Sequence, residues 1–149
     1  MEIEIMENQE ETLRVVIKCH KINPNILRLK SHISLFDNTI SAKKDNQTCF
    51  VNASDIFYFE SVNNRTFLYM EQEVLETAYR LYELESILPD EDFIRISKSQ
   101  ILNIHKVQTL KPELNRTILA TMCNGERLNI SRKYVPVLRN LLLGNCETI

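Results

Sequence analysis

Three short clusters of this sequence combine polar and basic residues, types whose side chains can hydrogen-bond to a base or to a phosphate. They are Asn63, Asn64, Arg65 and Thr66; Ser97, Lys98 and Ser99; and Arg132 with Lys133. Asn can pair with adenine through two hydrogen bonds, Arg can bind guanine or phosphate, and Ser hydroxyls suit phosphate oxygens. The same residue types are also typical of solvated turns and ordinary surface charge. The rest of the sequence must decide between these two interpretations.

The distribution of charge favours a polyanion partner, although the total charge does not. The 149-residue chain has 18 Lys and Arg against 20 Asp and Glu, a formal net charge of -2. Residues 93–149 carry nine basic and three acidic groups, whereas residues 41–92 carry four and eleven. The C-terminal third is thus the basic end of an acidic protein, an asymmetry that can mark a polyanion-binding face.

Residues that would support catalysis or a cofactor are poorly placed. Only two glycines occur, so the glycine-rich loops of Walker and dinucleotide-binding enzymes have no counterpart here. The four cysteines include no close pair, which argues against a zinc site or a disulfide framework. Cys19 and His20 would point to opposite faces of a strand, and His32 and His105 have no partners at metal-ligand spacing. We therefore expect no enzyme, cofactor, bound metal or small-molecule substrate.

Hydrophobic patterning from residue 39 onward predicts a mainly β domain with two short helices. The expected strands are 39–43, 48–51, 55–61, 66–71, 73–78, 93–96, 101–110, 116–122 and 126–130, and the expected helices are 79–88 and 132–143. Asn tolerates left-handed backbone angles, so Asn63-Asn64 is expected to form a hairpin tip. Asn124-Gly125 predicts a second tight hairpin, between the last two strands.

These elements place the polar clusters at the ends of strands. Lys98 falls between two strands, and Arg132 falls at the start of the last helix, where a basic residue is unfavourable unless an anion binds. If residues 103–111, 116–122 and 126–130 form a simple meander, Lys98 and Arg132 lie at opposite ends of its strands. The two clusters could then share only a long edge of an elongated domain.

The first 40 residues are expected to form an extension outside this domain. Residues 2–6 alternate acidic and apolar side chains and residues 13–19 are rich in β-branched types, so each run predicts a strand, and a helix follows Pro24. We divide the chain into a strand-strand-helix extension, 1–40, and a domain, 41–149. No apolar run reaches the length of a membrane span, and the acidic N-terminus is unlike a signal peptide. A cytoplasmic protein is expected.

Two longer blocks contain the second and third clusters, FIRISKSQILN at 93–103 and NGERLNISRKY at 124–134. Together with DIFYFES at 55–61, they resemble the DNA-binding domain of the LytTR family of bacterial transcriptional regulators. The resemblance covers about residues 40–145. It implies an elongated, mainly β fold (α+β overall) of antiparallel sheet that lays loops, rather than a recognition helix, along one side of the duplex. Family members often carry His where this chain has Ser97, and an aromatic residue where it has Gln100.

The resemblance also implies partners for the chain. The three clusters would contact double-stranded DNA, and because family sites are typically paired repeats, a homodimer is expected, assembled through residues 1–40. Many members carry a receiver domain before this module, which 40 residues cannot hold, so a stand-alone member is expected. Similar stand-alone members are often associated with a membrane protein that restrains them.

Two functions from different classes remain. The first is a sequence-specific DNA-binding transcriptional regulator that reads repeated sites through loops inserted in the DNA grooves. The alternative is a non-enzymatic protein-interaction or regulatory module without specific DNA binding, which would explain residues 1–40. A DNA reader should place Arg65, Lys98, Arg132 and Lys133 along one face, whereas a protein-binding module need not.

Overall fold

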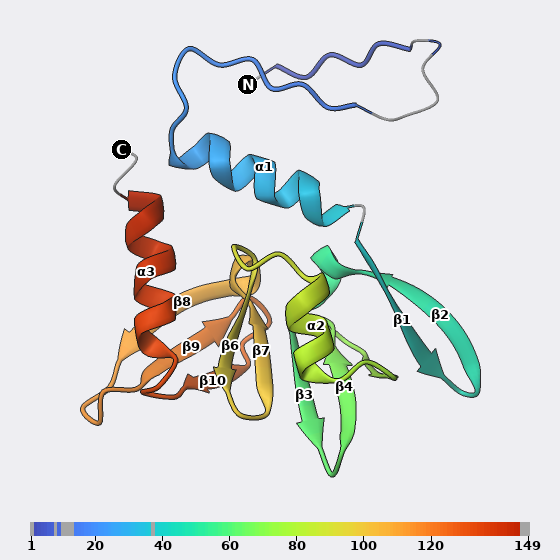
Figure 1. Ribbon diagram of the computed structural model, residues 1–149, viewed down its shortest axis with the longest axis vertical. Helices are drawn as coiled ribbons and strands as arrows, with labels where there is room; N and C mark the ends of the chain where they lie inside the picture. Colours follow the sequence, from blue (N-terminus) through green and yellow to red (C-terminus); the bar gives the residue numbers. More distant parts are fainter. Residues whose placement is uncertain (1, 8, 10–13, 37, 147–149) are drawn as a thin grey trace.

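The computed structural model describes residues 2–7, 9, 14–36 and 38–146, and within them the protein is mainly β (Figure 1). The elements are α1 (Pro24–Phe36), β1 (Thr39–Lys44), β2 (Gln47–Asn52), a 3-10 turn η1 (Ala53–Asp55), β3 (Tyr58–Val62), β4 (Arg65–Tyr69), β5 (Val74–Thr77), α2 (Leu81–Ile87), β6 (Phe93–Ser97), β7 (Gln100–Asn103), a second 3-10 turn η2 (Ile104–Lys106), β8 (Val107–Pro112), β9 (Ile118–Met122), β10 (Arg127–Ile130) and α3 (Val135–Cys146). Antiparallel sheet with short helices confirms the fold class expected from the sequence.

The strands form two antiparallel sheets. The first has seven strands in the order β2-β1-β5-β4-β3-β7-β6, and the second has three in the order β10-β9-β8. At the β3–β4 turn, Asn63 and Asn64 have φ of 51° and 61°. A two-residue hairpin turn of type I′ requires positive φ at both central residues, and Asn adopts it at low cost. The predicted Asn63-Asn64 tip is therefore confirmed, as is the Asn124-Gly125 turn, where Gly125 has φ of 89°.

Two hydrophobic cores lie on opposite faces of the seven-stranded sheet. Side chains alternate between the faces of a strand, so neighbours on β3 and β7 belong to different cores. Phe59 and Ile101 pack in the first core, which is covered by α2. Tyr58 and Leu102 pack in the second core, which the three-stranded sheet and α3 complete. The seven-stranded sheet is thus the layer that both halves of the protein share.

The 3-10 turn η2 at residues 104–106 interrupts the β structure between β7 and β8 and separates the two sheets. The sequence predicted one strand over 101–110, and this was wrong, because η2 divides it into β7 and β8. The buried side chain of Asn103 explains the break: its Nδ2 donates to Ile56 O at 2.8 Å and its Oδ1 accepts from His105 N at 3.0 Å. These bonds end β7 and turn the chain into the second sheet.

The N-terminal extension contains one of the three elements expected of it. α1 follows Pro24 as predicted and packs against η1 and α3. The strands predicted at 2–6 and 13–19 are wrong where the structure describes them, since residues 2–7 and 14–19 carry no strand. Their apolar side chains stay exposed, with Ile5 at 90% and Val16 at 67%. Alternation of side chains fits a strand only where a partner strand and a core are available.

His32 and His105, which have no partners at metal-ligand spacing in the sequence, meet in space. Their ring centroids lie 4.2 Å apart, and His105 Nε2 contacts the buried carboxylate of Asp92. The contact joins α1 to the 3-10 turn η2. Within the described ranges, no group of three His, Cys, Asp or Glu side chains is arranged to hold a metal ion.

We predict that Asn103→Ala destabilises the fold. The substitution leaves Ile56 O and His105 N without a partner at a buried position, so the free energy of unfolding should fall by about 1–3 kcal/mol in urea denaturation. Asn129→Ala, at an exposed position of β10, is the matched control and should change it by less than about 0.5 kcal/mol. Equal effects of the two substitutions would contradict the structural role of Asn103.

Candidate nucleic-acid interface

The three polar clusters lie in order along one edge of the protein, at the bottom of Figure 1. Two backbone hydrogen bonds fix this order. Ser61 N donates to Ser99 O at 2.8 Å, which joins the β3–β4 hairpin to the β6–β7 tip. Ser131 N donates to Ile96 O at 2.8 Å, which joins the end of β10 to the same tip. The edge therefore runs from Asn63-Asn64 through Lys98 to Arg132.

This arrangement corrects the expectation that Lys98 and Arg132 lie at opposite ends of a meander. The expectation assumed an unbroken strand over 101–110. Because η2 turns the chain back, β8 returns to the end of the molecule that holds the β6–β7 tip, and β10 ends there too. Lys98 and Arg132 are consequently neighbours along the edge.

The first tip, the β3–β4 turn, has two exposed Asn residues and two arginines that already form hydrogen bonds within the protein. Asn63 and Asn64 are exposed, and the Arg80 guanidinium donates to Asn64 O. Arg65 makes two hydrogen bonds with Glu76, at 2.9 and 2.6 Å, and lies over the Phe67 ring. Arg65 is thus on the edge but held in an ion pair.

Thr66 is the member of the first cluster that does not reach the surface. It is 2% exposed, and its hydroxyl oxygen is buried. On β4, Thr66 pairs with Ser61 and Thr77, and its side chain faces inward because side chains alternate along a strand. The Thr66 side chain is therefore not accessible from the edge in this structure.

The Arg65–Glu76 pair also shifts the ionisation of both groups. Hydrogen bonds from Arg65 hold the pKa of Glu76 below its ordinary value, and hydrogen bonds to Glu76 raise the pKa of Arg65. Glu76 is consequently ionised at neutral pH and competes with any other anion for the Arg65 guanidinium. A phosphate at this tip would have to replace that carboxylate.

The second tip presents Lys98 on a tightly bonded turn, and no carboxylate in the described part of the chain pairs with its ammonium. Lys98 is exposed, whereas Ser97 and Ser99 are half-buried and bond to each other: Ser99 N donates to Ser97 Oγ at 3.2 Å. The two Ser side chains thus shape the turn in addition to any contact that they make with a ligand. Lys98 is the residue of this cluster that projects from the edge.

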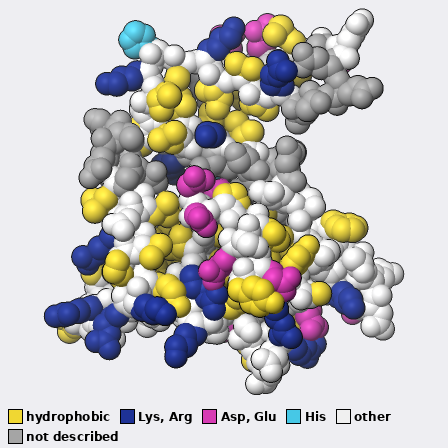
Figure 2. Space-filling model, viewed as in Figure 1, with side chains coloured by type: hydrophobic (Ala, Val, Ile, Leu, Met, Phe, Trp, Pro, Cys, Tyr) yellow, Lys and Arg dark blue, Asp and Glu magenta, His cyan; other side chains and the backbone are white. Residues whose placement is uncertain are grey.

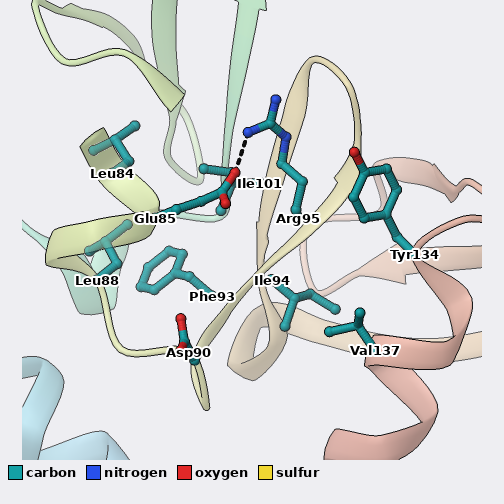
Figure 3. A pocket seen from close by; sticks show the side chains of 10 residues that line it. All are labelled: Leu84, Glu85, Leu88, Asp90, Phe93, Ile94, Arg95, Ile101, Tyr134 and Val137. Carbon is teal, nitrogen blue, oxygen red and sulfur yellow. Dashed lines mark hydrogen bonds and ion pairs between the residues drawn. The ribbon is translucent and has the colours of Figure 1, made fainter. Parts of the chain in front are cut away.

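Arg95 holds the second tip from behind. Its Nε donates to Ser97 O at 2.8 Å, and one terminal nitrogen donates to Lys98 O. The other terminal nitrogen pairs with the Glu85 carboxylate of α2 (Figure 3). Arg95 and Glu85 border a mainly apolar cavity of about 350 Å³ between α2, β6 and α3, which Tyr134 lines on the other side of Arg95 (Figure 3). Arg95 therefore connects the backbone of the tip to the body of the domain.

The third cluster lies in a turn that precedes the last helix. Helix α3 begins at Val135 and not at residue 132 as predicted, because Arg132–Tyr134 form a turn closed by Tyr134 N donating to Ser131 O at 2.9 Å. Arg132 and Lys133 are both exposed, and the Lys133 ammonium lies over the Tyr134 ring. Arg132 therefore stands directly beside the Lys98 tip with its guanidinium accessible.

Basic side chains gather along this edge in the space-filling view. Figure 2 shows Lys and Arg concentrated toward the bottom of the molecule, most densely at the lower left, where the three-stranded sheet ends in Figure 1. None of the helices in the described part of the chain has both the length and the hydropathy that a membrane span requires. The edge has the charge and the shape, a row of projecting loops, to contact an extended polyanion.

Sequence reasoning missed the residues that support the tips. Arg80 and Arg95 were not expected in the site, yet each donates to a tip carbonyl, Arg80 to Asn64 O and Arg95 to Lys98 O. One signal was available for Arg95: it is charged and stands between Ile94 and Ile96 in a strand, which marks the opposite face from these two core residues. No comparable signal identifies Arg80.

A family model and a solved structure identify the same family, and similar proteins carry regulatory names. Residues 46–143 match the family model described as the LytTr DNA-binding domain. A solved LytTr DNA-binding domain from Bacillus cereus superposes with a TM-score of 0.67 and 30% identity over 71% of this chain and 97% of that one. The chain is 28% identical to an uncharacterised HTH-type transcriptional regulator of Staphylococcus aureus, over 95% of this chain and 98% of that protein. It is 27% identical to the sensory transduction protein LytT of Bacillus anthracis, over 91% of this chain and 57% of that protein.

We predict that Arg95→Gln loosens the second tip without unfolding the domain. The shorter amide cannot reach Ser97 O and Lys98 O together, and one lost hydrogen bond of about 1.4 kcal/mol corresponds to tenfold faster opening. Amide hydrogen exchange measured by NMR should therefore be about tenfold faster at Ser99 and at Ser61, whose N–H donates to Ser99 O. Glu85→Gln keeps both carbonyl bonds and serves as the control. Unchanged exchange at both amides in Arg95→Gln would refute the role of Arg95.

Proposed function

The chain belongs to the LytTr DNA-binding domain family, and from this premise we propose that it is a transcriptional regulator that reads specific double-stranded DNA through loops of one basic edge. The observation that carries the proposal is the continuous row of tips: Asn63-Asn64, Lys98 and Arg132 are joined through backbone hydrogen bonds at Ser61 and Ser131. A protein that lies along one side of a duplex needs contacts spread over about 34 Å to reach successive major grooves. Separate loops on one long edge suit that geometry.

Each loop is suited to a different part of the DNA. Asn63 and Asn64 offer amides that can pair with adenine in a major groove, and Arg132 offers a guanidinium that can pair with guanine. Lys98, between them, is suited to phosphates or to the groove between those two sites. Ser97, Ser99 and Lys133 add donors for phosphate oxygens. Arg65 would join the contact surface by exchanging Glu76 for a phosphate.

Arg132 gives the clearest case for an anionic ligand. It lies just before the N-terminus of α3, where the helix dipole disfavours a cation, and no carboxylate among the described residues pairs with it. A DNA phosphate or the electronegative edge of guanine would remove this unfavourable interaction. The same helix end would also attract a phosphate.

The assembly and cellular context follow from the proposed partner. We propose that the protein binds paired DNA repeats as a homodimer in the cytoplasm, with residues 1–40 contributing to the contact between subunits. A membrane protein that binds the regulator and restrains it is part of the same proposal. A sedimentation measurement that gives a monomer both alone and on a two-repeat duplex would refute the dimer.

The alternative function, a protein-interaction module without specific DNA binding, has one observation in its favour. The extension exposes apolar side chains, among them Ile3, Ile5, Val15 and Val16. Selection of bound sequences from a random duplex library distinguishes the two functions. Enrichment of a repeated motif would support the regulator. Weak binding with no motif, lost as salt rises, would instead favour the protein-binding module.

Arg132→Ala is predicted to weaken DNA binding while leaving the fold intact. If Arg132 pairs with a base, affinity for the selected duplex should fall by about 1–3 kcal/mol and the preference at that base pair should relax. Fluorescence anisotropy against the selected duplex and its single-base variants measures both quantities. Arg127→Ala, at the other end of β10, is the matched control. Equal losses for the two variants would contradict a specific role for Arg132.

Glu76→Gln is predicted to strengthen DNA binding. The substitution removes the carboxylate that holds Arg65 and frees the guanidinium for a phosphate, so the slope of log affinity against log salt should steepen by about 0.9. Glu91→Gln removes an exposed acid from the turn before β6, away from the tips, and controls for the change in net charge. If both variants bind alike, Arg65 does not contact DNA.

A further inference from the structure

The loop that joins β8 to β9 lies at the same end of the protein as Arg132. Pro112 at the end of β8 pairs with Ile118 at the start of β9, and Ile118 pairs in turn with Ile130 at the end of β10. The loop, residues 113–117, therefore projects from the end of the three-stranded sheet where β10 ends. The chain continues from that same end to Arg132. The loop follows Arg132 on the side away from Lys98, at the lower left of Figure 1.

Internal hydrogen bonds fix the shape of this loop. Glu113 N donates to Thr117 O at 2.9 Å, Arg116 N donates to Glu113 O at 3.2 Å, and Thr117 Oγ1 donates to Asn115 Oδ1 at 2.6 Å. Arg116 has φ of 66°, in the left-handed region that Gly and Asn adopt more readily than a long side chain does. A defined turn thus places an arginine where the backbone favours a different residue.

The side chains of the loop are those of a contact surface. Arg116 and Lys111 are exposed, and within the described residues no carboxylate forms an ion pair with either. Leu114, at the outer end of the turn, is fully exposed at 105%. Two free cations flank an apolar tip, and the densest group of basic side chains in Figure 2 covers this end of the sheet. A DNA strand alternates phosphates, which cations bind, with deoxyribose sugars, which an apolar side chain can pack against.

We propose that the β8–β9 loop and the adjoining end of β8 form a fourth DNA-contacting element, in which Lys111 of β8 and Arg116 of the loop bind phosphates and Leu114 packs against the intervening sugar. The loop extends the contact surface past Arg132, so the protein covers DNA outside the base pairs that the three clusters read. This inference rests on the proposed function of the edge. Because phosphate contacts carry no sequence information, the loop adds affinity and salt dependence but does not change the preferred sequence.

Substitutions that respect the turn test the proposal. Arg116→Asn removes the cation and retains a residue that tolerates positive φ, so the loop keeps its fold. The slope of log affinity against log salt should decrease by about 0.9 for Arg116→Asn and by about twice that when Lys111→Gln is added, with the selected motif unchanged. Leu114→Ser should lower affinity about threefold with an unchanged slope. Arg127→Gln, at the other end of the same sheet, is the matched control and should leave the slope as it is.

Shortened DNA provides an independent measurement. Trimming the selected duplex by several base pairs beyond the Arg132 half of the site should weaken binding of the natural protein. The same trimming should leave Arg116→Asn with Lys111→Gln unaffected, because that variant has already lost these contacts. The fourth contact alone would be overturned if the natural protein binds the selected motif but has the same slope of log affinity against log salt, and the same response to trimming, as Arg116→Asn with Lys111→Gln. A natural protein without a selected motif would overturn the proposed function itself.

Discussion

The buried amide of Asn103 determines how the two halves of the protein face a ligand. Its bonds to Ile56 O and His105 N end β7 and turn the chain, so that β8 runs back toward the β6–β7 tip. Without that turn, β7 and β8 would form one long strand, and Arg132 would be carried to the far end of the molecule. The edge that holds Asn63, Lys98 and Arg132 exists because one polar side chain is satisfied inside the core. A buried amide with its partners in place is strongly directional, since any other arrangement leaves polar groups unpaired.

Side chains from the body of the domain hold the tips by hydrogen bonds to their carbonyl groups. Arg80 donates to Asn64 O and Arg95 donates to Lys98 O, so each tip is held from a neighbouring element. Such support reduces the ordering cost when a ligand binds, because the loop is already in one conformation. Arg65 differs from Arg80 and Arg95, because its guanidinium pairs with the Glu76 carboxylate and is not available to a ligand until that pair opens. The edge therefore combines cations that pair with no described carboxylate, such as Lys98, with Arg65, which must be released from Glu76.

Much of this structure could be predicted from local sequence, and the exceptions share a physical cause. The hairpin tip at Asn63-Asn64 and helix α1 after Pro24 depend on neighbours within a few residues, and both are confirmed. The strand break at Asn103 depends on Ile56, 47 residues earlier, and no local pattern reports it. The strands predicted at 2–6 and 13–19 failed for a related reason: alternation cannot supply the partner strand that a sheet needs. Thr66 was placed in the site by its position beside the tip, although the pleat of β4 turns its side chain inward.

The spacing between the contact loops is set by packing rather than by the loops themselves. The two sheets meet through the bond from Ser131 N to Ile96 O and through the second core, where Ile96 and Ile130 are both fully buried. Interiors are close-packed, so a change in side-chain volume there shifts one sheet against the other. Such a shift would move Arg132 relative to Lys98 while leaving both residues in place. Because DNA presents its grooves at fixed intervals, the second core determines which arrangement of bases the edge can read.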